Sequence, residues 1–124
     1  MQETKGPAPG NRINLPELLA RLDDDRELLR DLLSTFKEDF PGHLQALREA
    51  VERQDMKQAT VVSHTLKGML SNLAVTKAAA TAAQLEHLAS GGREVPLKEA
   101  LAAFEREVEG LLPEMKTYMA EARL

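Results

Sequence analysis

Apolar residues recur at steps of three and four along most of the chain, which is the period of an amphipathic α-helix. Apolar residues with this spacing occur in residues 15–22, 62–73 and 97–119, and an alanine-rich stretch fills residues 76–89. No segment shows the alternation with a period of two that a half-buried strand requires. The pattern therefore predicts an all-α fold. Its clearest run is Leu29, Leu33, Phe36, Phe40, Leu44, Leu47 and Val51.

Three helix starts can be placed from polar residues that are followed three positions later by Glu or Gln, the spacing of an N-terminal capping box. Asn14, Asp24 and Asp55 satisfy this rule, so we expect a short first helix, a long second helix and a third helix to begin there. Pro41 and Gly42 lie inside the second helix, but the apolar period continues through them. This predicts one kinked helix rather than two.

The remaining helices follow from stop signals and a proline. The third helix is expected to run to about Leu73, and the fourth from Thr76 to Ala89, before a Ser-Gly-Gly stop. Pro96 fits the first turn of a fifth helix that continues to Met119. Four long helices with short connections predict an up-and-down antiparallel four-helix bundle, with an additional short N-terminal helix packed on it as a lid or brace.

Length, charge and composition narrow the possible functions. The 124 residues suffice for one domain, which we place at residues 14–124, after a Pro- and Gly-containing N-terminal tether at residues 1–13. The net charge of -4 and a total of three Phe and one Tyr argue against nucleic-acid binding. The absence of cysteine and of any long apolar run predicts a soluble cytoplasmic protein without direct membrane contact, and we expect a monomer.

One histidine lies on the wrong side of its helix to be a core residue. At 100° of rotation per residue, His64 lies opposite an apolar stripe on the same helix, so its side chain should face water. The stripe consists of Val62, Leu66, Met69 and Leu73. Four small or polar neighbours fall within about 60° of His64 and share its exposed face. They are Thr60, Lys67, Gly68 and Ser71.

Lys67 and Gly68 indicate that this exposed histidine could carry a phosphoryl group. A solvent-facing imidazole is nucleophilic near neutral pH, and a lysine one turn away can neutralise a phosphoryl group placed on it. Glycine costs about 1 kcal/mol relative to alanine inside a helix, but it leaves room for a partner to approach the ring. In a chain with seven glycines and seven lysines, chance supplies this Lys and Gly spacing to one of three histidines in about 1% of cases.

The same residues resemble the histidine phosphotransfer (HPt) domain of bacterial two-component phosphorelays. The resemblance rests on the segment His64-Thr65-Leu66-Lys67-Gly68, on residues 71–74 and 84–86, and on the long preceding helix with its proline. It covers about residues 14–120. It implies a four-helix bundle whose histidine accepts a phosphoryl group from an aspartyl phosphate on one receiver domain and passes it to another. A response regulator or a hybrid histidine kinase would supply these receiver domains.

By this resemblance, His64 is the phospho-accepting residue, Lys67 stabilises charge and Gly68 is the small docking residue, with Ser71 and Thr60 beside it on the docking face. The family often places a polar side chain from the next helix against the imidazole. The candidates for this orienting role are Gln84 and Glu86, and the sequence does not choose between them. Ala74 departs from the family, in which a glycine is common after the third helix, and this leaves the geometry of the loop open.

No glycine-rich nucleotide loop occurs in the sequence, so we expect a phosphoryl carrier without autonomous kinase activity. It would bind no cofactor itself and would meet Mg²⁺ on the partner receiver. The histidine patterns of metal sites are absent, so no metal site is predicted, and His43 and His87 are interpreted as ordinary solvated residues. Two alternatives stay open, namely the phospho-accepting domain of a chemotaxis-type kinase and a non-catalytic helical adaptor bundle.

Overall fold

The computed structural model describes residues 12–121, and this part of the chain is all-helical, as predicted. Six helices and no strand occur in this range: α1 (Leu15–Arg21), α2 (Arg26–Glu52), α3 (Met56–Asn72), α4 (Thr76–Ser90), α5 (Glu94–Val108) and α6 (Leu111–Glu121). Among these helices, none combines the length and the apolar character needed to cross a bilayer.

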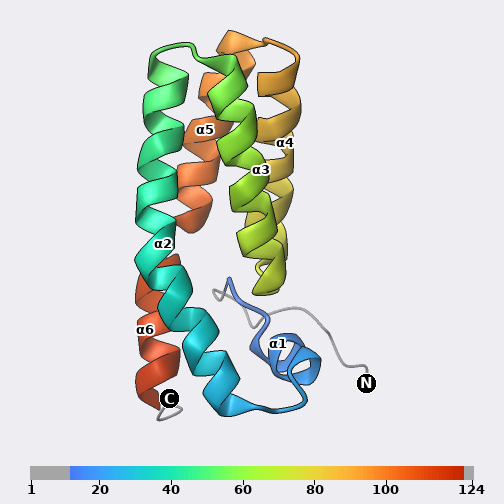
Figure 1. Cartoon of the computed structure of the whole chain (residues 1–124), viewed down its shortest axis with the longest axis vertical. Helices are drawn as coiled ribbons and strands as arrows, with labels where there is room; N and C mark the ends of the chain where they lie inside the picture. Colours follow the sequence, from blue (N-terminus) through green and yellow to red (C-terminus); the bar gives the residue numbers. More distant parts are fainter. Residues whose placement is uncertain (1–11, 122–124) are drawn as a thin grey trace.

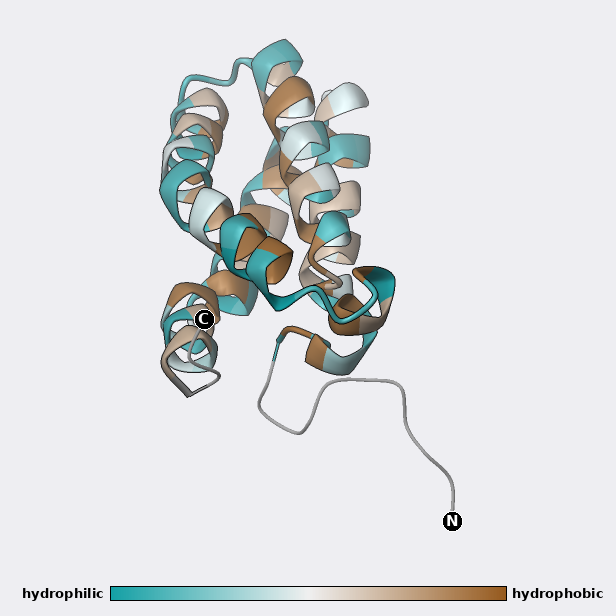
Figure 2. Ribbon diagram, turned by 60° about the horizontal axis from the view of Figure 1, so that its bottom comes forward, coloured by the Kyte–Doolittle hydropathy of each residue, from teal (hydrophilic) through white to brown (hydrophobic). Residues whose placement is uncertain are grey.

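The four longest helices lie side by side, and each runs in the opposite direction to the one before it (Figure 1). α2 contacts α3 and α5, α4 contacts α3 and α5, and α6 packs against α2 and α5. Each of the four long helices buries apolar side chains in one shared core, among them Leu33, Leu66, Leu85 and Phe104. Figure 2 shows hydrophobic and hydrophilic residues alternating along the helical ribbons, as expected where one face of each helix is buried.

Two of the three predicted N-terminal caps lie where the sequence placed them. Oδ1 of Asn14 accepts a hydrogen bond from the backbone N–H of Glu17 at 3.2 Å. Asp55 accepts one from the N–H of Gln58 at 3.1 Å. Each cap satisfies a backbone donor that the first turn of a helix otherwise leaves unpaired.

The predicted cap of α2 is wrong by one residue. Asp25, and not Asp24, accepts the N–H of Leu28 at 3.0 Å. Asp23 and Asp24 adopt left-handed backbone conformations instead, with φ of 53° and 62°. Asp tolerates this region better than most residues, so the first two aspartates make the turn and the third caps the helix.

Helix α2 continues through Pro41, in agreement with the prediction of one helix rather than two. Figure 1 shows that its axis changes direction about halfway along its length. A proline inside a helix lacks the backbone N–H and its ring displaces the carbonyl four residues earlier, which bends the helix. The rings of Phe36 and Phe40 stack just before the proline with centroids 4.8 Å apart, and both are buried.

The predicted fifth helix is two helices. α5 ends at Val108 and α6 begins at Leu111, so the expectation of one helix as far as Met119 is wrong. The ring of Pro113 conflicts with the carbonyl four residues earlier, and Gly110 is a poor helix former. Together they break the helix, although the apolar period continues across the break and keeps Leu111 buried.

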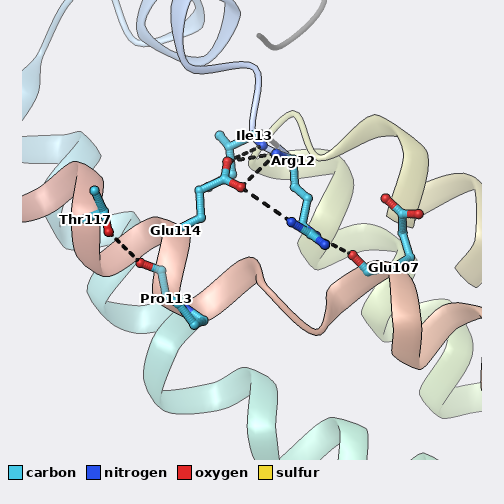
Figure 3. A network of polar contacts seen from close by, with 6 residues as sticks. All are labelled: Arg12, Ile13, Glu107, Pro113, Glu114 and Thr117. Atoms are coloured by element: carbon cyan, nitrogen blue, oxygen red, sulfur yellow. Dashed lines mark hydrogen bonds and ion pairs between the residues drawn. The ribbon is translucent and has the colours of Figure 1, made fainter. Parts of the chain in front are cut away.

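The break between α5 and α6 is covered by the start of the described chain (Figure 3). Nε of Arg12 donates to the carbonyl of Glu107 at 2.7 Å. The carboxylate of Glu114 accepts the backbone N–H groups of Arg12 and Ile13 at 2.8 and 3.0 Å. A Cβ atom on Gly110 would lie 2.8 Å from Nη1 of Arg12, so a larger residue at this position would displace the end of the Arg12 side chain.

These contacts correct the predicted end of the N-terminal tether. Ile13 is buried, with 1% of its surface exposed, and Arg12 is bonded to α5 and α6. The folded part of the chain therefore begins before residue 14. The rest of the predicted tether, residues 1–11, lies outside the described residues, as do residues 122–124.

Helix α1 braces the turn between α3 and α4. The backbone N–H of Asn14 donates to the carbonyl of Ala74 at 3.4 Å, and Arg21 donates to the carbonyl of Ser71 at 2.9 Å. Leu18, on the inner face of α1, is fully buried. The short helix thus occupies the bracing position expected for it, at the end of the helix that carries His64.

Candidate functional site

His64 lies on the face of α3 that points away from the core. Its side chain is 67% exposed, whereas the neighbouring Val62 and Leu66 are buried. The rotation predicted from the helical period is confirmed. His64 is therefore open to a partner and is not part of the hydrophobic core.

The imidazole is held by a carboxylate from the adjacent helix. Nδ1 of His64 lies 3.0 Å from Oε2 of Glu86 on α4. Because a carboxylate oxygen can only accept, Nδ1 carries the proton in this hydrogen bond. In the neutral ring the lone pair is then on Nε2, which forms no hydrogen bond within the described residues.

Lys67 shares the same carboxylate. Its Nζ lies 2.8 Å from Oε1 of Glu86, and the two side chains are 35% and 26% exposed. The hydrogen bond from Lys67 is the main reason why the pKa of Glu86 lies below its ordinary value, and contact with His64 adds to this lowering while burial opposes it. Glu86 is consequently ionised at neutral pH and joins His64 to Lys67.

Of the two side chains proposed to contact the imidazole, the structure brings only Glu86 to it. Gln84 is exposed on α4 and forms no hydrogen bond with His64. It lies two residues before Glu86, which is about 200° around the helix axis. Both residues fit the sequence pattern, because the choice depends on how α4 is rotated against α3.

The surface beside His64 is open. Gly68 is exposed, and a Cβ atom built on it would meet no atom within 4 Å. Ser71 is exposed one turn further along. Thr60 lies one turn before His64, half-buried, and its hydroxyl donates to the carbonyl of Met56 at 2.8 Å. The residues predicted to share the face of His64 therefore do so.

A groove between α2 and α3 lies next to this face, and the sequence pattern does not predict it. Phe36, Asp39 and His43 line it from α2, and Thr65 and Met69 line it from α3. His43, interpreted as an ordinary solvated residue, is half-buried at this groove, whereas His87 is exposed on α4. A groove formed by two helices depends on their packing, and the period of either helix alone does not reveal it.

No cluster of three His, Asp or Glu side chains that could hold a metal ion occurs among residues 12–121. The family model described as the Hpt domain matches residues 31–123, which extend from the second turn of α2 through α6. The chain therefore belongs to the Hpt domain family, which carries histidine phosphotransfer in two-component phosphorelays and interacts with receiver domains. No curated protein and no solved structure matches the chain.

Proposed function

We propose that this chain accepts a phosphoryl group on Nε2 of His64 from the aspartyl phosphate of one receiver domain and passes it to a second receiver domain. One observation carries the assignment to His64. Its Nδ1 is engaged by Glu86 at 3.0 Å while the side chain is 67% exposed. This arrangement supports Nε2 as the nucleophile, because the lone pair is fixed on the nitrogen that a partner can reach.

The transfer step needs no group beyond this chain and the receiver. The Nε2 lone pair forms the N–P bond as the O–P bond of the acyl phosphate breaks, and the electron pair of that bond returns to the aspartate carboxylate. Lys67 lies one turn from His64 on the same exposed side, and its ammonium would stabilise the charge on the phosphoryl group. Mg²⁺ would accompany the receiver, and this domain would bind no cofactor of its own.

We assign docking of the receiver to the face formed by Gly68, Ser71 and Thr60. The open space above Gly68 supports this assignment, since a partner must come within bonding distance of His64. The order of helix contacts supports assigning α2 to α5 to the up-and-down antiparallel four-helix bundle. Since such a bundle buries its own apolar faces, we propose that the domain acts as a monomer.

The test compares the native domain with His64→Gln in a time course with labelled, phosphorylated receiver domains. We expect the native chain to gain label and then to lose it to a second receiver. The Gln variant should take no label, while its unfolding free energy changes by no more than about 0.5 kcal/mol because the side chain is exposed. His43→Gln and His87→Gln are the matched controls and should transfer normally.

The same time course distinguishes the alternatives. A phospho-accepting domain of a chemotaxis-type kinase would take label from an ATP-loaded kinase domain and none from a receiver. An adaptor bundle would take label from neither source. Label on the His64→Gln variant, or label located on His43 or His87 of the native domain, would show that His64 is not the accepting residue.

A further inference from the structure

We infer that Arg21 on α1 is a specificity-determining docking residue, whose guanidinium attracts the acidic surface around the aspartyl phosphate of a receiver domain. The inference rests on the proposed function of His64. It goes further by extending the docking face from α3 to α1 and by stating the charge of the receivers that this domain accepts.

The position of Arg21 is set by the end of the helix that carries His64. α1 lies below this end of α3 in Figure 1. Nη1 of Arg21 donates to the backbone carbonyl of Ser71 at 2.9 Å. This carbonyl belongs to the last turn of α3, where the partial negative charge of the helix dipole favours a cation. Arg21 is thereby fixed beside Ser71, a residue of the docking face.

A receiver bound at His64 would cover Arg21. Ser71 follows His64 by seven residues, which places it about 10 Å further along α3 and about 20° away around the helix axis. A protein interface of ordinary size buries about 800 Å² on each partner, the area of a circle with a radius of about 16 Å. His64 lies near the centre of this area, because the N–P bond forms there. The interface therefore extends past Ser71 to the guanidinium that is bonded to it.

Arg21 has donors left for a partner. Its side chain is 46% exposed, and its Nη2 is paired with Glu17 at 2.7 Å. Among the contacts of residues 12–121, the bonds to Ser71 and Glu17 use two of the five N–H groups of the guanidinium. The remaining N–H groups can donate to a carboxylate on the receiver.

The chemistry of a receiver supplies the complementary charge. Its aspartyl phosphate is anionic, and further carboxylates hold its Mg²⁺. The phosphoryl group and these carboxylates together outweigh the two positive charges of the ion. A cation at the edge of the docking face attracts such a surface and speeds the encounter of the two proteins.

The charged neighbours of Arg21 give it particular weight. Residues 15–25 contain no other cation, and Glu17 and the three aspartates at positions 23–25 are all negative. The aspartates are exposed. Without Arg21, this part of the chain would present only carboxylates to the receiver, and like charges repel across an interface.

The experiment measures binding of the domain to a receiver loaded with beryllofluoride and Mg²⁺, a mimic of the aspartyl phosphate that cannot be transferred. The receiver is one that phosphorylates the native domain in the time course described above. Association and dissociation rates are recorded between about 50 mM and about 500 mM salt, a range over which exposed charges become screened. Loading of His64 by phosphoramidate, a small-molecule phosphoryl donor, is measured in parallel because it needs no receiver.

Arg21→Gln should slow association about two- to fivefold at low salt and much less at high salt, as expected for a charge at the rim of an interface. Arg21→Lys keeps the charge and should retain most of the rate. Arg106→Gln is the matched control, because it removes the same charge from an exposed arginine on α5, which packs against α2 and α4 rather than α3. The control should associate at the native rate, and all three variants should load His64 normally.

Glu17→Gln separates a docking role of Arg21 from a bracing role. This variant removes the anion that competes with the receiver for the guanidinium, so association should become about twofold faster at low salt. If Arg21 only braced the end of α3, loosening it in this way would not speed association. Unchanged or slower association of Glu17→Gln would therefore overturn the inference.

Two further results would also overturn it. One is equal association of the native domain and Arg21→Gln at low salt. The other is a loss that Arg21→Lys shares and that salt does not alter. Each of these results leaves His64 as the acceptor. A native domain in which His64 takes no phosphoryl group from phosphoramidate or from any receiver would overturn the proposed function and the inference together.

Discussion

At the scale of single residues, Lys67 has a different partner in the resting protein from the one proposed for it during transfer. Its Nζ is paired with Glu86 at 2.8 Å, so contact with a phosphoryl group on His64 would exchange one anion for another. For Lys67→Ala we expect transfer to slow about ten- to a hundredfold, the equivalent of about 1.5 to 3 kcal/mol for a charge-assisted contact. Rates of receiver-to-domain transfer measure this, and an unchanged rate would leave Lys67 with no part in the chemistry.

Substitutions at Gly68 should affect the stability of the domain and its transfer rate in different ways. No atom lies within 4 Å of the position of a Cβ there, so larger residues fit the folded domain. Gly68→Ala should raise the unfolding free energy by up to about 1 kcal/mol, because glycine loses more backbone freedom on folding. Gly68→Arg should fold equally well but slow transfer steeply, since its side chain would stand between His64 and the receiver.

The two Gly68 variants are compared by melting temperature and by transfer rate. If Gly68→Arg transfers the phosphoryl group as fast as the native domain, Gly68 is not part of the docking face. An unfolded Gly68→Arg variant would contradict the exposed position that the structure gives this residue.

How far the sequence predicts the site depends on which helices are involved. The exposure of His64, Lys67 and Gly68 follows from one helix, because the apolar period of α3 fixes which side is buried. The choice of Glu86 over Gln84 depends on the rotation of α4 against α3, which no single period encodes. The groove beside Thr65 has the same origin in the packing of two helices.

At the scale of elements, the ends of α2 and α3, like the turn after α1, contain a non-glycine residue in the left-handed conformation. Gln54 after α2 has φ 60° and Ala74 after α3 has φ 59°. This conformation costs about 1 kcal/mol for a residue with a Cβ. Ala74 stands where a glycine was expected by resemblance, and the turn keeps its left-handed geometry despite the alanine.

Glycine at these two positions should have different effects. Gln54 is exposed, so Gln54→Gly should stabilise the domain by about 0.5 kcal/mol after the loss of its surface hydrogen bond with Glu94. Ala74 is only 2% exposed, so relief of the backbone is offset by the loss of a buried methyl group worth about 0.8 kcal/mol. Ala74→Gly should therefore be nearly neutral. Urea unfolding of both variants tests the comparison, and a larger gain for Ala74→Gly would contradict it.

Helix boundaries show what the hydrophobic period leaves out. The period correctly carries α2 through Pro41, where the helix bends and continues. It fails at Gly110, where the same kind of apolar spacing continues across a break. Both places contain a glycine and a proline, so these residue types alone do not distinguish them. The break differs in that Arg12, from a distant part of the sequence, packs against Gly110.

At the scale of the whole molecule, the start of the described chain is tied to its last helix. The side chain of Glu114 is 10% exposed and accepts the backbone N–H groups of Arg12 and Ile13. These residues are about a hundred positions apart in sequence, so local patterns predict α1 itself but not where it docks. The matched family region, residues 31–123, contains Glu114 but neither of its partners.

Neutralising this carboxylate should loosen the N-terminal segment. Glu114→Gln is expected to lower the unfolding free energy by about 1.5 to 3 kcal/mol, the range for hydrogen bonds to a charged group. Glu109→Gln, at an exposed position beside the same break, is the control and should change it by no more than about 0.5 kcal/mol. Denaturant unfolding gives both values. Equal stability of the two variants would show that the segment contributes little to the fold.

The central claim, that His64 carries the phosphoryl group, is tested most directly by locating that group on the native domain after transfer from a receiver. Labelling the histidines with ¹⁵N allows the phosphorus to be assigned to one ring nitrogen through its ³¹P–¹⁵N coupling. We expect coupling to Nε2 of His64 and none to His43 or His87. Coupling to either of those residues, or to Nδ1 of His64, would contradict it.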